Sequence, residues 1–167
     1  MQDTPHSPGP DSRVADRSID EQSIPDRSVV EWVAGWGAEV AAADIRSGRR
    51  RFDDGLIAFG THADVVVGRD AVEAGQWSQI WPAIEDFEFL LEELRVRLSA
   101  DGLMAVAIVP WISTGIDPDG NPFDRPGRAT IVLEREATGD PWTGTHTHFS
   151  LARGVSQSTF GRREAIR

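Results

Sequence analysis

The sequence predicts a single α+β domain in which helices come first and a sheet follows. Its 167 residues, 40% of them hydrophobic, suit one domain with a core of its own. Apolar side chains recur at helical spacing early in the chain, whereas from residue 87 onward apolar runs are separated by turn sequences. Helices followed by a run of strands indicate the α+β class.

Residues 1–27 are predicted to form a disordered or loosely attached arm, because the stretch holds four prolines and few large apolar side chains. It lacks the basic and apolar regions of a secretory signal. No apolar run in the chain approaches the roughly 18 residues of a membrane-spanning helix. We therefore expect a cytoplasmic protein that does not interact with a membrane.

The domain itself is expected to span residues 28–154 and to open with a helix. Ser28 and Glu31 have the spacing of a capping box. Apolar side chains then follow at helical spacing, and the helix is predicted to end near Gly48. Two short strands, in LIAFG and VVVG, flank the turn THAD, and GRDAVEAGQWSQIWP predicts a second helix.

Four strands are predicted after residue 87. They lie in FEFLLEELRVRLSADG, LMAVAIVPWIS, RATIVLERE and WTGTHTHFSLAR. Turn sequences rich in Asp, Gly and Pro separate them, which favours a meander. Residues 155–167 lack a clear period and are expected to be a frayed tail.

The composition excludes several kinds of chemistry. With 27 acidic residues against 17 basic ones, the net charge is -10, which repels phosphate backbones and argues against nucleic-acid binding. The absence of cysteine excludes disulfides, thiolate nucleophiles and cysteine-based zinc sites. All basic residues are Arg, so no lysine can form a Schiff base, and no tyrosine can act as an acid or an oxyanion donor.

Two motifs resemble the SnoaL-like branch of the nuclear transport factor 2-like superfamily, which includes ketosteroid isomerases. They are FDDGLIAFGTHADVVVGRDAVEAGQW and the closing pattern Trp142-x-x-x-His146-x-His148-x-Ser150. The resemblance covers residues 29–153. It implies a cystatin-like fold, with a strongly curved antiparallel sheet wrapped around N-terminal helices and a conical cavity open at one end. We predict no cofactor.

The closing strand alternates between two predicted faces. One face carries Trp142, Gly144, His146, His148 and Ser150, and the intervening residues form the other. The two histidines could ligate a metal, transfer a proton, or be hydrogen-bonded residues of an ordinary sheet face. A metal would require a further ligand that the sequence does not place, so we predict no metal site.

A ligand pocket is predicted inside the cone. Aromatic residues at these spacings are usually core residues, and Arg128 could point inward or lie exposed at a loop edge. The predicted pocket residues are Trp36, Phe59, Trp77, Trp81, Trp111, Arg128, His146 and His148. The function expected from this set is binding of a small, mostly apolar molecule, with no activity assigned.

Two other functions remain open at this stage. One is an acid–base isomerase, cyclase or dehydratase of the ketosteroid-isomerase type, with Asp64, His62 and His146 as its catalytic residues. The turn THAD fits a solvated loop equally well. The other is an oligomerising interaction module. A homodimer is expected in any case, because LMAVAIV is apolar on both faces and two helices can cover only one side of a sheet.

Overall fold

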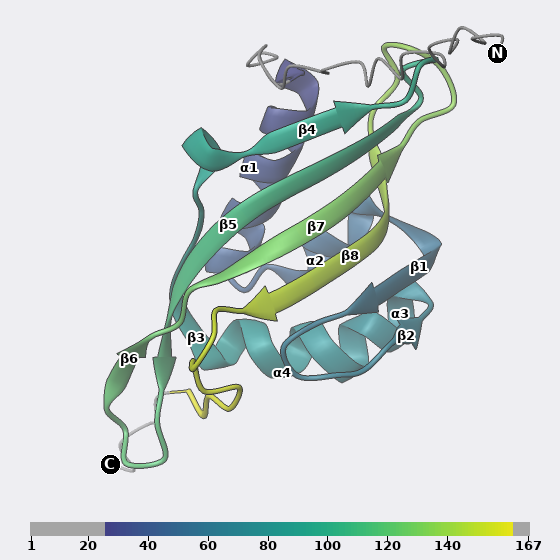
Figure 1. The fold of residues 1–167 in the computed structure, drawn as a ribbon. Helices are drawn as coiled ribbons and strands as arrows, with labels where there is room; N and C mark the ends of the chain where they lie inside the picture. The colour runs from purple at the N-terminus through teal and green to yellow at the C-terminus, as the bar shows by residue number, and fades with distance from the viewer. Residues whose placement is uncertain (1–25, 162–167) are drawn as a thin grey trace, which may run out of the picture.

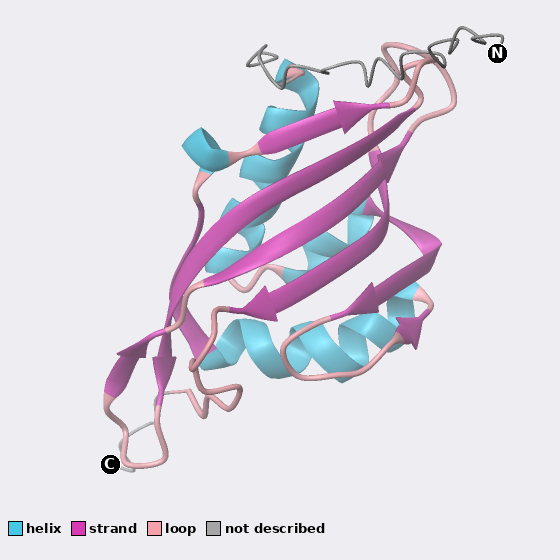
Figure 2. Cartoon of the chain, in the orientation of Figure 1, coloured by secondary structure: helices cyan, strands magenta, loops and turns pink. Residues whose placement is uncertain are grey.

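The computed structural model describes residues 26–161, which form one curved eight-stranded sheet with helices on its concave side (Figure 1). Figure 2 shows the division into strands, helices and loops. The strands are β1 (Phe52–Phe59), β2 (Val66–Val67), β3 (Ile84–Phe89), β4 (Arg95–Leu98), β5 (Met104–Ile116), β6 (Pro122–Asp124), β7 (Gly127–Glu134) and β8 (Thr143–Leu151). The α+β class predicted from the sequence is confirmed.

The helical elements are short apart from the first. They are α1 (Arg27–Ala41), α2 (Ile45–Gly48), α3 (Arg69–Val72) and α4 (Ser78–Ile80), with a π-helical turn at Glu73–Trp77 and 3-10 turns at Arg49–Arg51, Trp81–Ala83 and Leu91–Glu93. The run from Arg69 to Ala83 is continuous, as the second predicted helix required. Within residues 26–161, none of the helices combines the length and apolar character needed to cross a membrane.

The sheet has the strand order β2-β1-β8-β7-β5-β3, and β4 and β6 also pair with β5. All pairs are antiparallel except β1 and β8, which run parallel. The sheet is therefore mixed, whereas a wholly antiparallel one was expected. The parallel strands β1 and β8 lie far apart along the chain. The long connection that parallel pairing requires is therefore available to them.

The start of α1 corrects the predicted capping box. Asp26 is the N-cap residue, and its side chain accepts a hydrogen bond from the Ser28 amide at 2.9 Å. The helix was expected to reach Gly48 but ends at Ala41, because Ala43 adopts a positive φ of 50° that α-helical geometry does not allow. Asp44 then caps the short α2 by accepting from the Ser47 amide.

The first predicted strand after residue 87 is in fact two strands, β3 and β4, separated by the 3-10 turn Leu91–Glu93. The alternation of apolar and polar residues expected of a strand breaks at the adjacent residues Leu90 and Leu91. Leu91 packs against the core, and Leu94, after the turn, is itself buried. Two large apolar residues three positions apart point to the same side through a 3-10 turn but not along a strand.

Local irregularities give the sheet its curvature. The pairing register shifts in β1 between Phe52 and Ile57, in β3 between Glu85 and Glu88, and where Val132 and Leu133 of β7 pair with β8. Bulges of this kind bend a strand and increase its twist. The concave face that results packs against α1 and the Arg69–Ala83 run, and this contact forms the core.

The structure describes only part of the two expected terminal segments. The predicted arm, residues 1–27, lies almost wholly outside the described residues, and only its last two positions belong to the start of α1. Residues 157–161, expected to be frayed, are hydrogen-bonded to the domain. The Thr159 hydroxyl donates to the Ala83 carbonyl at 2.6 Å and accepts from the Ile116 amide at 2.9 Å.

Candidate ligand cavity

A cavity lies between α1, the Arg69–Ala83 run and the concave face of the sheet. Its lining is mostly apolar and aromatic: Trp36, Val40, Thr61, Gln76, Trp77, Ile80, Trp81, Ile84, Phe87, Trp111, Arg125 and Phe149. Its volume, taken as the space open to the centres of water-sized molecules, is about 40 Å³. One water needs roughly 10–15 Å³ on this measure, so the cavity has room for a few waters or one small organic group.

Aromatic rings form most of the wall and hold one another in place. Trp77 and Trp81 stack with their ring centroids 5.4 Å apart, and Phe87 stacks on Trp111 at 5.7 Å. Phe149 of β8 contacts Trp36 and Trp111 at 5.5 and 5.9 Å. Ring pairs at these separations are mutually stabilising, so the cavity has a defined shape.

The Arg125 side chain is buried in this wall, with 1% of its surface exposed. Its Nη2 donates to the Thr61 hydroxyl at 2.8 Å and to the backbone carbonyl of Gln157 at 3.4 Å, while Nε has no hydrogen-bond partner in the described part of the chain. The guanidinium carbon lies 5.7 Å from the Trp111 ring centroid. Burial lowers the pKa of Arg125 to about 10, so the group keeps its charge at neutral pH. Among residues 26–161, no carboxylate forms an ion pair with it.

Other polar atoms of the lining also lack partners within the described part of the chain. They are the indole nitrogens of Trp36 and Trp111 and the Oε1 of Gln76. Buried polar groups are nearly always hydrogen-bonded, so each exception calls for an explanation. Three of the four unpartnered atoms around this cavity, counting Arg125 Nε, are N–H donors.

The local sequence explains how these groups reach the cavity. Arg125 sits between β6 and β7, where its amide donates to the Ser113 carbonyl at 2.8 Å and fixes the backbone against β5. Gly127 follows, and a side chain there would come within 2.3 Å of the Trp111 ring. Gln76 belongs to the π-helical turn, a feature found often at functional sites. Its amide packs against the backbone of Gly60, where a Cβ would lie 1.9 Å from Nε2.

The structure places half of the predicted pocket residues around the cavity. Trp36, Trp77, Trp81 and Trp111 line it. The other four, Phe59, Arg128, His146 and His148, lie on the outer face of the sheet and are absent from the lining. This corrects the pocket predicted from the sequence.

A bulge in β8 explains the error. Leu133 of β7 pairs with Gly144, and the adjacent Val132 pairs with His146, which leaves Thr145 as an extra residue. Beyond the bulge, Thr147 and Phe149 continue the inward face that Gly144 begins. A single extra residue exchanges the two faces of a strand, so His146 and His148 point away from the core.

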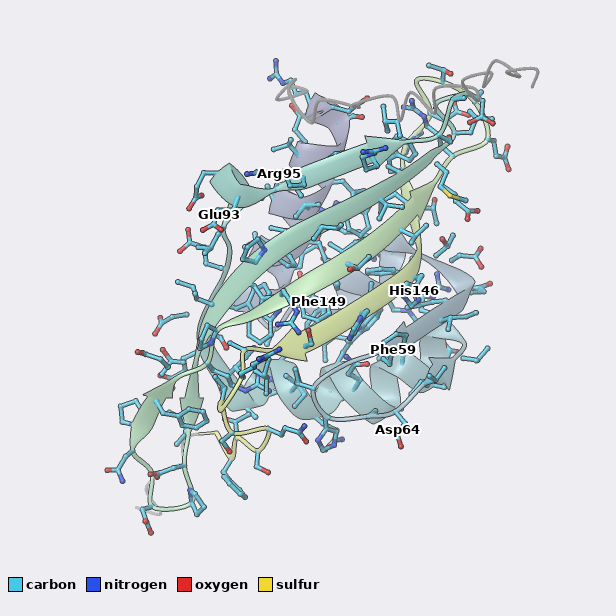
Figure 3. All side chains as sticks on the ribbon, viewed as in Figure 1. Phe59, Asp64, Glu93, Arg95, His146 and Phe149 are labelled. Atoms are coloured by element: carbon cyan, nitrogen blue, oxygen red, sulfur yellow. The ribbon has the colours of Figure 1, made fainter. Side chains whose placement is uncertain are left out.

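The histidine pair forms part of the outer surface. His146 Nδ1 donates to the Ile57 carbonyl at 2.8 Å, since a carbonyl can only accept. The Phe59 ring packs on His148 with centroids 4.2 Å apart, and His146 lies beside it (Figure 3). Burial, His146 and Arg128, in that order, lower the pKa of His148. Within the described ranges, no three His, Cys, Asp or Glu side chains are grouped to hold a metal.

The proposed catalytic residues are not brought together. Asp64 and His62 are exposed on the loop between β1 and β2, and Figure 3 shows Asp64 at the lower edge of the molecule, apart from both His146 and Phe149. His146 is on the outer face of β8. Their catalytic roles therefore have no geometric support.

Sequence reasoning missed Arg125, Gln76 and Thr61. Arg125 follows the turn DPDGNPFD, where a charged residue is ordinary. The sequence contains no signal that distinguishes it from the exposed Arg128 three residues later. Gln76 offers a weak signal, since it is a polar residue next to Trp77 on the expected inward side of a helix.

The described residues form an α+β domain in which a curved sheet and the helices packed on it enclose a cavity. The chain belongs to the SnoaL-like domain family, which matches residues 29–154, and the suspected family is confirmed. A comparison with curated proteins gives no match.

Solved structures share the fold. A ketosteroid isomerase-like protein from Erwinia carotovora atroseptica is 16% identical with a TM-score of 0.63, covering 75% of this chain and 94% of its own. A nuclear transport factor 2-like superfamily protein from Salmonella enterica is 17% identical with a TM-score of 0.63, covering 79% and 95%. The S. rosetta CaMKII hub is 17% identical with a TM-score of 0.62, covering 77% and 97%.

Proposed function

We propose that this SnoaL-like protein binds a small, mostly apolar molecule in the cavity described above. The observation that carries the proposal is the lining itself, which combines stacked aromatic rings with buried polar atoms that have no hydrogen-bond partner among residues 26–161. Binding sites for small molecules are typically apolar hollows with a few polar groups that orient the ligand. The ligand must be small, of about one ring, because the cavity is small.

Acid–base catalysis has less support than binding. Among the described residues that line the cavity, none is Asp, Glu or His, so no ordinary general base faces a bound molecule. The exposed positions of Asp64 and His62 agree with this assignment. We therefore favour a binding protein over an isomerase, cyclase or dehydratase.

Titration of the purified protein with benzamide, a neutral single-ring probe, tests the proposal. Calorimetry should show saturable binding, and tryptophan fluorescence should change, because four tryptophans line the cavity. Ile80→Trp fills the cavity and should weaken binding at least about tenfold, or 1.4 kcal/mol. Ile45→Trp is the matched control, since Ile45 is also a half-buried helical isoleucine but does not line the cavity. Absence of saturable binding, or equal loss in both variants, would contradict the proposal.

We also propose that two copies associate through the outer face of the sheet. Several apolar side chains on or beside this face are exposed: Ile57 (44%), Met104 (42%), Ile108 (47%) and Ile112 (40%). Exposed apolar side chains on one face of a sheet mark a candidate interface. The expected cytoplasmic location stays a prediction.

A further inference from the structure

We infer that the ligand carries an anionic head group, as a small aromatic or apolar monocarboxylate does, and that Arg125 binds this group inside the cavity. The inference rests on the proposed function, because it assigns a chemical class to the molecule proposed to occupy the same cavity. It follows from three properties of the site: an unneutralised buried charge, an excess of hydrogen-bond donors, and an apolar remainder.

The first property is the charge of Arg125. Its side chain is 1% exposed, and within residues 26–161 its hydrogen-bond acceptors are the Thr61 hydroxyl and the backbone carbonyl of Gln157, both neutral. A buried cation is unfavourable unless an opposite charge accompanies it. Among the described residues of the lining, none is acidic and could neutralise it. A bound carboxylate would supply the missing negative charge.

The second property is the balance of donors and acceptors. The unpartnered atoms of the lining are three N–H groups, on Arg125, Trp36 and Trp111, and one acceptor, the Gln76 Oε1. A ligand rich in acceptors satisfies such a set better than one rich in donors. A carboxylate offers two oxygens and fits the planar guanidinium, often with two parallel hydrogen bonds.

The third property is the rest of the cavity. Trp77 and Trp81 form a stacked pair, and Ile80 and Ile84 lie beside them in the lining. These surfaces suit a hydrocarbon or a single ring, whereas a hydrophilic dianion would leave its second charge without a partner. The site therefore selects for one negative charge on a small apolar body.

Arg125 could instead be purely structural, holding the Thr61 loop and the Gln157 segment together. This role predicts a stability effect but no preference for anions. The two roles are separated by comparing benzoate with benzamide, which have nearly the same shape and differ in charge. Titrations should be done at about 0.15 M salt, where charges more than roughly 8 Å apart are largely screened, because the chain carries a net charge of -10.

The experiment measures the affinity of both probes by calorimetry. The unaltered protein should bind benzoate at least about tenfold more tightly than benzamide. Arg125→Gln should bind both probes equally. Arg125→Lys keeps the charge without the planar fork and should retain part of the preference. Arg128→Gln is the control, since Arg128 lies exposed on the outer face of β7, and it should behave as the unaltered protein.

The outcomes separate the two proposals. If benzamide binds but benzoate binds no better, or if folded Arg125→Gln keeps the preference, the anion inference is overturned and the proposed function stands. If neither probe binds, both are overturned. Should Arg125→Gln fail to fold, the benzoate-to-benzamide ratio of the unaltered protein and of Arg125→Lys decides the question.

Discussion

The properties of single side chains in this protein depend on their burial as well as on their chemical type. Arg125 and Arg128 are three positions apart, yet one is enclosed by aromatic rings and the other is exposed. His148 is a second case. Burial, then His146, then Arg128 disfavour its charged form and lower its pKa in the folded state.

This shift predicts a loss of stability in mild acid. The unfolded chain takes up a proton near the ordinary histidine pKa of about 6.5, whereas folded His148 takes it up only at lower pH. The free energy of unfolding should therefore fall as pH decreases through about 6.5 and until the folded pKa is passed. His148→Gln should reduce the difference between pH 7.5 and pH 5.0, measured by urea denaturation.

The matched control for this prediction is His62→Gln on the exposed loop. It should keep the pH dependence of the unaltered protein. An undiminished acid loss in His148→Gln would show that other groups are responsible.

At the scale of elements, backbone details decide where helices begin and how closely strands pack. The N-terminus of α1 is capped by Asp26, whose pKa is lowered chiefly by a hydrogen bond from the Ser28 hydroxyl. The strand β7 begins at a glycine because the Trp111 ring and the Ser150 carbonyl leave no room for a Cβ.

Two substitutions distinguish the Asp26 cap seen in the structure from the Ser28–Glu31 capping box predicted from the sequence. Asp26→Ala should lower the free energy of unfolding by about 1 kcal/mol, since it removes an acceptor for the helix amides. Glu31→Ala should cost no more than about 0.5 kcal/mol, because its ion pair with Arg27 is exposed. Urea denaturation at neutral pH measures both. Equal losses would favour the capping box instead.

Gly127 provides a second test at this scale. A Cβ at this position would lie 2.3 Å from the Trp111 ring and 2.4 Å from the Ser150 carbonyl oxygen, so Gly127→Ala should cost about 1–3 kcal/mol. Nothing lies within 4 Å of a Cβ at Gly75. Gly75→Ala should therefore be neutral or stabilising, by up to about 1 kcal/mol. Tolerance of Gly127→Ala in denaturant titrations would mean that β5 and β7 can separate.

For the whole molecule, the main feature is the outer face of the sheet, on which several apolar side chains are exposed. The helices occupy the concave side (Figure 1). The exposed isoleucines and Met104 on the other side therefore have no cover from the described residues. Ala107 and Val109, which belong to the apolar run LMAVAIV, are fully buried and face the core. Ile108, between them, faces outward.

Sedimentation velocity at micromolar concentration should therefore give about twice the monomer mass of 18.3 kDa. Ile108→Glu should shift the protein to the monomer, because an unpaired charge in an apolar interface is unfavourable. Val65→Glu is the control, since Val65 is 64% exposed but lies on the loop before β2. A strictly monomeric unaltered protein would contradict the dimer.

The sequence by itself determined the class of the domain, the order of its main helices and strands, and the family. These depend on local spacing of apolar residues and on a closing motif, both of which are visible along the chain. The four tryptophans now found around the cavity were also predictable, because tryptophan side chains are highly buried on average.

Only the tertiary structure decided which polar residues face the cavity. One extra residue at Thr145 turned His146 and His148 outward, and alternation along a strand cannot reveal a bulge that is defined by pairing with its neighbour. Arg125 became an interior cation because β5, the Thr61 loop and the Gln157 segment enclose it. Burial of a charge is a property of segments far apart in the sequence, and local composition does not determine it.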